Sequence, residues 1–149
     1  MKPRLAIGLG NPLMGDDGVG WYIAERLAGD PRLPSDMEVI QGGTDLLRCS
    51  DRMEGRTRIF LIDAMQSDAE PGIVSVVESG PDTLVHAQEN AHQLSVAAAV
   101  NLLQLTVSAS FTLLVVAIPV VRAGYELSSS MSARMPVMVE RVLQEMGRV

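Results

Sequence analysis

The hydrophobic positions of this 149-residue chain alternate between short apolar runs and longer stripes of helical spacing. Apolar runs without period-two alternation are typical of strands that are covered on both faces of a parallel sheet. Such runs, or weaker versions of them, predict five strands, at residues 5–7, 37–40, 59–62, 73–77 and 111–118. Helices are predicted between them, at residues 19–27, 46–53 and 92–105 and from about 130 to 146.

The last predicted helix carries the clearest stripe. Its apolar residues fall at relative positions 0, 3, 4, 7, 8 and 11, which is one face of an amphipathic helix: Met135, Met138, Val139, Val142, Leu143 and Met146. Methionines at this spacing are typical of a hydrophobic core rather than of a metal or cofactor site. Because Met131 extends the stripe, we expect the helix to begin near Ser130 and to continue with a kink through Pro136, rather than to start at that proline.

The order of these elements predicts one α/β domain over residues 1–149, with a five-stranded mixed sheet between two layers of helices. Only eight residues, 64–71, separate the third strand from the fourth. A parallel crossover requires a dozen or more residues. The fourth strand is therefore expected to run antiparallel to the third strand and to lie at an edge. Residues 79–91 have no periodicity and are predicted to form a loop.

Composition narrows the class of partner. A net charge of -6 disfavours binding to a phosphate backbone, and five aromatic residues offer few platforms for base stacking. The longest apolar run, residues 111–121, is shorter than the roughly 20 residues of a membrane span. No signal peptide is evident, and the single cysteine, Cys49, suits a reducing compartment as a buried residue. We expect a soluble, cytoplasmic monomer that binds neither nucleic acid nor membrane.

The turn after the first strand contains two adjacent carboxylates. Residues 5–20 read LAIGLGNPLMGDDGVG, in which Asp16 and Asp17 lie between the strand and the first helix. One of them is a candidate helix N-cap, favoured by the helix dipole. Only one residue can occupy the cap, and the repulsion between two carboxylates requires compensation. The turn alone leaves open whether either residue takes part in chemistry.

The ends of other predicted strands carry further polar residues. Asp63 is expected to close the third strand, as a site residue or as a plain turn residue. Thr44, after the second strand, is predicted to cap the short helix that follows. Ligands of open α/β sheets bind beyond the carboxyl ends of the strands, where the strand order reverses. If the first and third strands are neighbours, Asp17 and Asp63 face one crevice, with His92 as a third member. Such a set suits a divalent metal with open coordination positions.

Four blocks of the sequence resemble the maturation endopeptidases of nickel-iron hydrogenases, which trim the C-terminal tail of the large-subunit precursor. The blocks are GNPLMGDDGVG, GGTDLL, LIDAM and AHQLS, in matching order along almost the whole chain. The resemblance implies a phosphorylase/hydrolase-like α/β fold with strand order 2-1-3-5-4. It maps metal-binding and catalytic roles onto Asp17, Asp63 and His92, and it places a substrate loop at Gly42, Gly43 and Thr44. Gln41 departs from the family, which often has an acidic residue there.

The resemblance also implies that nickel is supplied by the precursor and signals complete assembly, so that the protease holds no metal of its own. The metal then polarises the scissile carbonyl or lowers the pKa of an attacking water. In the alternative mechanism Asp17 or Asp16 is the general base of an aspartic-type peptidase, and nickel only docks the substrate. The sequence does not separate these two mechanisms.

Three other functions fit parts of the pattern. Peptidyl-tRNA hydrolases begin with a similar GLGNP turn, but they need an early histidine, and none precedes His86 here. A nucleotide-binding loop is suggested by Gly8 and Gly10, but its third glycine would fall at Leu13 and no Lys-Ser/Thr pair follows. The remaining alternative is a non-catalytic nickel-binding chaperone.

Overall fold

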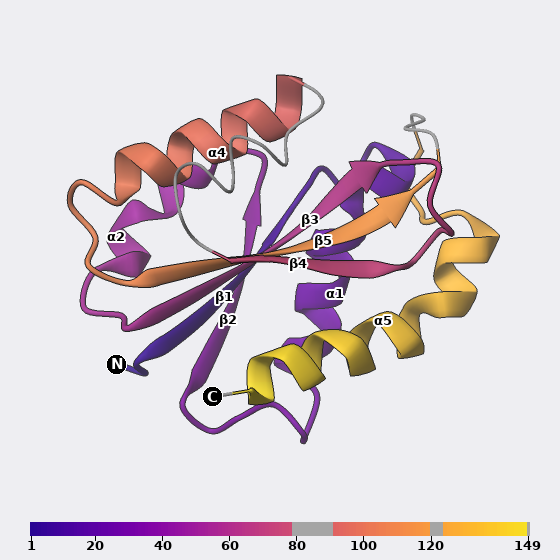
Figure 1. Ribbon diagram of the computed structural model, residues 1–149. Helices are drawn as coiled ribbons and strands as arrows, with labels where there is room; N and C mark the ends of the chain where they lie inside the picture. The colour runs from indigo at the N-terminus through magenta and orange to yellow at the C-terminus, as the bar shows by residue number, and fades with distance from the viewer. Residues whose placement is uncertain (79–90, 120–123, 149) are drawn as a thin grey trace.

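Five strands form one sheet in the order β2-β1-β3-β5-β4 in the computed structural model (Figure 1). The structure describes residues 1–78, 91–119 and 124–148, without the side chains of 78 and 91–95. The strands are Arg4–Leu9 (β1), Met37–Gly43 (β2), Arg58–Gln66 (β3), Val74–Glu78 (β4) and Ser110–Ile118 (β5). β4 is antiparallel to β5, whereas the other neighbouring pairs are parallel. The predicted order and the edge position of the fourth strand are confirmed.

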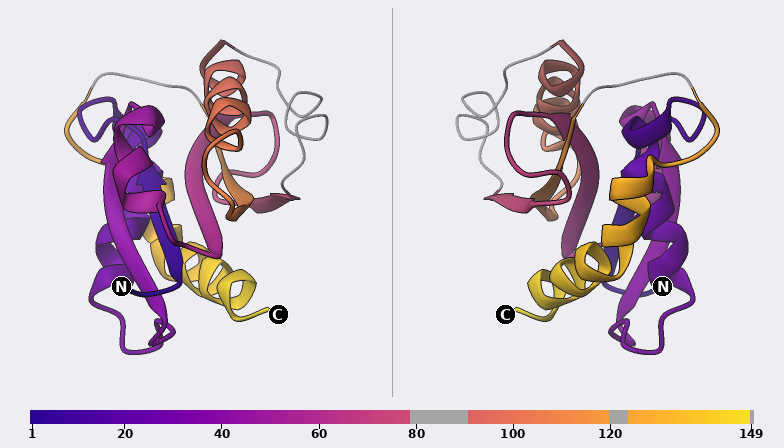
Figure 2. Two further views of the ribbon diagram at one scale, coloured as in Figure 1. Left: turned by 90° about the vertical axis from the view of Figure 1, so that its left-hand side faces the viewer. Right: turned by 90° about the vertical axis from the view of Figure 1, so that its right-hand side faces the viewer.

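Helices cover both faces of this sheet (Figures 1 and 2). One face carries Val19–Ala28 (α1) and Ser129–Gly147 (α5), and the other carries Ser50–Met53 (α2) and Ala91–Leu103 (α4). Two 3-10 turns, Gly15–Gly18 (η1) and Leu46–Cys49 (η2), directly precede α1 and α2. The arrangement is the three-layer α/β fold that the sequence predicts. Among the described residues, none of the helices has the length and apolar character needed to cross a bilayer.

Side chains of the central strands alternate between two cores. In β3, Phe60 and Ile62 pack with α1 and α5, whereas Ile59 and Leu61 pack with the α4 side. All four are completely buried. Successive residues of a strand point to opposite faces, so an apolar run without alternation fills both cores at once.

The predicted start of the last helix and its continuation through Pro136 are confirmed. α5 begins at Ser129 and continues through Pro136, and Met131, at its start, is buried with the rest of the methionine stripe. Ser128 caps the helix, because its Oγ accepts a hydrogen bond from the Met131 backbone N–H at 3.4 Å. The predicted cap of η2 was wrong by one residue. Asp45, not Thr44, accepts from the Leu47 N–H, at 3.1 Å.

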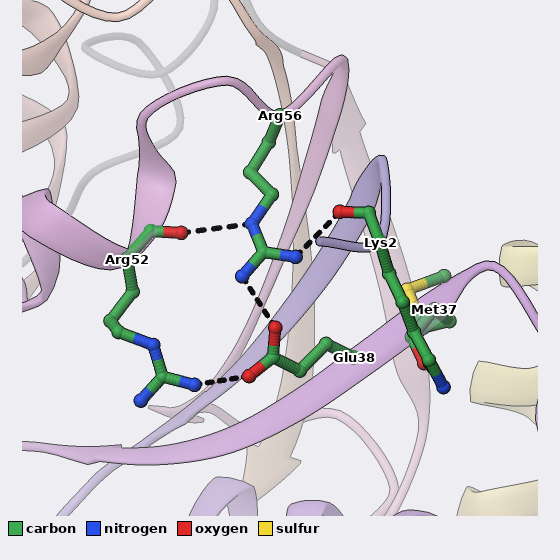
Figure 3. A network of polar contacts seen from close by, with 5 residues as sticks. All are labelled: Lys2, Met37, Glu38, Arg52 and Arg56. Carbon is green, nitrogen blue, oxygen red and sulfur yellow. Dashed lines mark hydrogen bonds and ion pairs between the residues drawn. The ribbon is translucent and has the colours of Figure 1, made fainter.

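A buried arginine joins the N-terminus, β2 and α2 at the end of the sheet where the parallel strands begin (Figure 3). The Arg56 guanidinium donates to the backbone oxygens of Lys2 and Arg52, the latter at 2.9 Å, and to the Glu38 carboxylate. Arg52 donates to the same carboxylate. Because Arg56 is only 6% exposed, its charge depends on these partners for stabilisation.

Glu38→Gln is expected to lower the free energy of unfolding at pH 7 by about 1–2 kcal/mol, because Arg56 loses its carboxylate partner. The hydrogen bond from Arg56 holds the pKa of the Glu38 carboxyl below its usual range, against the opposing effect of burial. A lowered folded-state pKa contributes stability that is complete above the unfolded value and is lost as pH falls through the folded value. In urea unfolding, wild type and variant should therefore differ at pH 7 and converge in acid.

The matched control is Glu54→Gln, which changes an exposed carboxylate at the end of α2, the helix that carries Arg52. It should leave stability unchanged at both pH values. If the difference in free energy of unfolding between wild type and Glu38→Gln stayed constant down to the lowest pH at which the protein is folded, the ionised Glu38 carboxylate would not be the source of this stability.

Candidate active site

The candidate site lies where β1 ends between β2 and β3. Gly8 of β1 is in register with Ile62 of β3, and Leu9 is in register with Gly43 of β2 after a register shift. The Gly10 N–H then donates to the Gly43 carbonyl at 2.9 Å. Since β2 and β3 flank β1 on opposite sides, the strand order reverses here, and this is where open α/β sheets bind ligands.

Two glycines let the following turn lie directly on these strand ends. A Cβ atom on Gly20 would lie 2.3 Å from the carbonyl oxygens of both Leu9 and Ile62. A Cβ atom on Gly10, which has a φ of +121°, would lie 2.2 Å from the carbonyl oxygen of Asp17. The turn η1 consequently contacts β3. It brings Asp17 to the end of the sheet where the parallel strands finish, called the carboxyl edge below, as predicted from the sequence.

Asp17 is partly exposed at this edge. One of its carboxylate oxygens, Oδ2, accepts from the Asn11 backbone N–H at 3.3 Å. Its own N–H donates to the Met14 carbonyl at 3.1 Å within the turn. The carboxylate is therefore held near the strand end while it remains accessible to a ligand.

Asp63 lies inside β3 and does not close it, contrary to the sequence prediction. The strand continues because β5 pairs with it as far as Gln66. Asp63 is the first residue of β3 beyond the register with β1, it is 3% exposed, and its Oδ1 accepts from the Ala64 N–H at 2.9 Å. Leu61 and Met65, two residues to either side, pack on the α4 side, so Asp63 shares that face of the sheet.

His92 lies in the first turn of α4, but its side chain is outside the described part of the structure. α4 leads into β5, which runs parallel to β1 and β3. The helix therefore returns across the sheet, and its first turn lies toward the carboxyl edge. His86 is outside the described residues. Among the side chains that are described, no three His, Cys, Asp or Glu residues are grouped to hold a metal ion. The convergence of Asp17, Asp63 and His92 stays a prediction.

Asp16 has a different role from its neighbour. Neither aspartate caps α1, whose N-cap position is Gly18 and has no side-chain hydrogen bond. Asp16 is buried, and both of its oxygens accept from Ser128, at 2.7 Å from the backbone N–H and 2.8 Å from Oγ. Sequence reasoning missed this contact because its partners are far apart in the chain. Of the two carboxylates, Asp17 is the one accessible at the edge.

The predicted substrate loop borders a hollow of about 260 Å³. Gly42 is closely packed, since a Cβ there would lie 2.4 Å from Ile7 Cγ2, and Gly43 has a φ of +73°. Thr44 lines the hollow together with residues of η2 and α4: Asp45, Leu46, Leu47, Val96, Ala98, Ala99 and Leu102. The α4 side chains that line it, among those that the structure describes, are uncharged. The hollow therefore presents mainly apolar surface next to the loop.

A larger hollow, of about 470 Å³, lies at the opposite end of the sheet. It is lined by Arg58 and Thr112, near the starts of β3 and β5, and by the end of α5. Arg141 and Arg148 both pair with Glu145, and Arg58 donates to Thr112 Oγ1 at 3.0 Å. Its volume alone would make this hollow the better candidate for the active site. Its arginine side chains, however, already have partners, and it lies away from the carboxyl edge of the sheet.

Cys49 is buried, as predicted. Burial raises the pKa of its thiol, and the nearby carboxylates of Asp45 and Asp51 raise it further. The thiol is therefore protonated at neutral pH, which disfavours a role as a nucleophile.

Several solved structures of hydrogenase-maturating endopeptidases share this fold. The endopeptidase HybD of Escherichia coli matches with a TM-score of 0.77 and 26% identity, over 97% of this chain and 93% of that one. The [NiFe] hydrogenase maturation protease HybD of Thermococcus kodakarensis matches with a TM-score of 0.79 and 26% identity, over 97% and 99%.

The sequence agrees with the fold. Residues 21–145 match the hydrogenase maturation protease family, and the chain belongs to that family. The hydrogenase 2 maturation protease of E. coli is 30% identical over 95 residues, which cover 62% of this chain and 58% of that protein. The hydrogenase expression/formation protein HupD of Rhodobacter capsulatus is 33% identical over 73 residues, 48% of this chain and 35% of that protein. The chain thus spans about half the length, or less, of the curated relatives it matches.

Proposed function

We propose that this protein is an endopeptidase that removes the C-terminal extension of a nickel-iron hydrogenase large-subunit precursor after nickel has been inserted. The observation that carries the proposal is the placement of Asp17 and Asp63 at the β1–β3 edge in a chain of this family. Both carboxylates lie where the strand order reverses, at the expected position of a ligand site.

Nickel in this proposal belongs to the substrate. Two carboxylates and one imidazole, from Asp17, Asp63 and His92, fit a borderline divalent ion, but they are too few to close its coordination. The purified protein is therefore expected to bind free nickel weakly. When the precursor brings the ion, nickel supplies Lewis-acid chemistry toward the scissile carbonyl or a water.

The protein's own residues orient that substrate. Asp63 is held inside a central strand, and Asp17 is held by a turn packed on two strand ends, so the carboxylates are fixed before the precursor binds. Such preorganisation lowers the entropic cost of aligning the peptide bond. In the aspartic-type alternative, the accessible Asp17 carboxylate accepts a proton from the attacking water.

The substrate loop lies beside a surface suited to a polypeptide. The chain turns at Gly43, at the end of β2, and Thr44 lines the hollow between η2 and α4. Leu47 and Leu102 line this hollow and are 41% and 54% exposed. The apolar side chains available there support a peptide substrate rather than a phosphate-bearing one.

The deciding experiment incubates the full-length protein with candidate large-subunit precursors, loaded with nickel or nickel-free, and follows loss of the tail by mass spectrometry. Cleavage is expected only for the nickel-loaded precursor. Equal cleavage of the nickel-free precursor would contradict the nickel signal. Binding of nickel-loaded precursor without any tail loss would instead identify a non-catalytic chaperone.

A further inference from the structure

The buried carboxylate of Asp16 is the least expected polar group near the candidate site. It is 5% exposed, and a buried aspartate is costly unless its charge is compensated by hydrogen bonds. Among the described residues the compensation comes from Ser128, which donates through both its backbone N–H and its hydroxyl. Hydrogen bonds to a charged acceptor are stronger than neutral ones, so this contact is a firm connection.

Backbone contacts reinforce the connection. The Gly15 N–H donates to the Gly124 carbonyl at 3.0 Å, and the Gly124 N–H donates to the Leu13 carbonyl at 3.1 Å. Met14 and Gly124 form an isolated parallel bridge. The turn from Leu13 to Asp16 is thus fastened to the segment that precedes α5, although Asp16 and Ser128 are 112 positions apart in sequence.

The same turn carries Asp17. On the sheet side, Gly10 lets the Asp17 backbone lie against the end of β1. On the other side the turn is held by Asp16, and Ser128 is itself fixed as the N-cap of α5. The carboxylate of Asp17 has a weaker attachment, the 3.3 Å hydrogen bond from Asn11. Its position therefore depends on how firmly the turn is held.

We infer that Asp16 is a positioning residue, which fixes the Asp17 carboxylate for catalysis by holding η1 against Ser128. The inference rests on the proposed function, in which Asp17 contacts the substrate-borne metal or the attacking water. Loss of the Asp16 contact leaves that side of the turn held only by the backbone contacts with Gly124. A displacement of the Asp17 carboxylate by about 1 Å is enough to cost on the order of a hundredfold in rate.

The test compares Asp16→Ala, Asp16→Asn, Ser128→Ala and Ser128→Thr in the full-length protein. Two readouts are measured: amide hydrogen exchange at Gly15 and Asp17, and kcat and KM for tail removal. Asp16→Ala should speed exchange at both amides about tenfold or more and lower kcat about 10- to 100-fold, with KM nearly unchanged. Ser128→Ala should show smaller changes in the same direction. Ser128→Thr, which keeps the hydroxyl, should retain wild-type exchange rates and wild-type kcat.

Val142→Ala is the matched control for loss of stability. It removes buried volume from α5, toward the far end of the helix from Ser128, and should lower the melting temperature without changing kcat or the two exchange rates. If Asp16→Ala does not fold, Asp16→Asn, which retains the acceptor for the Ser128 N–H, provides the comparison.

Wild-type exchange rates in Asp16→Ala and Ser128→Ala would overturn the inference, as would faster exchange with wild-type kcat. A kcat loss in Val142→Ala that matches its loss of stability would also overturn it. If the wild-type protein cleaves no precursor, the proposed function fails by itself. Exchange at Asp17 then still decides whether Asp16 holds the turn.

Discussion

Asp17→Asn, Asp63→Asn and His92→Ala are each expected to lower kcat/KM for removal of the precursor tail by about 10²–10⁴-fold. An amide in place of a carboxylate keeps the shape of the side chain but loses the negative charge that attracts a cation or accepts a proton. For Asp63 the change falls inside a central strand that is paired along its whole length with β5. The backbone geometry should therefore persist, so that activity is lost in a folded protein.

The measurement is single-turnover tail loss from nickel-loaded precursor, with unfolding in urea as the check on folding. His86→Ala is the control, because His86 is the other histidine of the chain and is expected to lie outside the cluster. Full activity in all three site variants, or an equal loss in His86→Ala, would rule out the proposed triad.

Gly20→Ala is expected to destabilise the protein by about 3 kcal/mol or more, although alanine normally favours a helix over glycine by about 1 kcal/mol. Its new Cβ would lie 2.3 Å from the carbonyl oxygens of Leu9 and Ile62. Both are backbone atoms of the two central strands, so neither can move without separating α1 from the sheet. The steric clash outweighs the gain in helix propensity, so the substitution is destabilising, because the new Cβ meets backbone atoms on two sides.

Gly29→Ala is the matched control at the other end of the same helix, where a Cβ would meet nothing within 4 Å. Its free energy of unfolding should stay within about 0.5 kcal/mol of wild type. Thermal and urea unfolding of both variants provide the measurement. A Gly20→Ala protein as stable as Gly29→Ala would show that the first turn of α1 can move away from the strand ends.

Elements defined by local pattern were predictable from the sequence. The apolar runs of β3 and β5 identified buried strands because both faces of each strand are covered. The methionine stripe identified α5 and its continuation through Pro136. The eight-residue link, residues 64–71, was too short for a crossover, which fixed the direction of β4. The position of Asp17 in the turn after β1 was predictable because a strand followed by a glycine-rich turn and a helix has few alternative geometries.

Tertiary structure decided what depends on distant partners. β3 runs past Asp63 because β5 offers hydrogen bonds as far as Gln66, and a strand's length is set by its neighbour as well as by its own residues. Asp16 was a candidate helix cap by local rules, yet it binds Ser128, whose position is fixed by packing of α5 on the sheet. The residues next to Asp16 in the sequence give no indication of such a contact. The two adjacent aspartates therefore differ in role only through the fold, which buries one against α5 and leaves the other at the carboxyl edge.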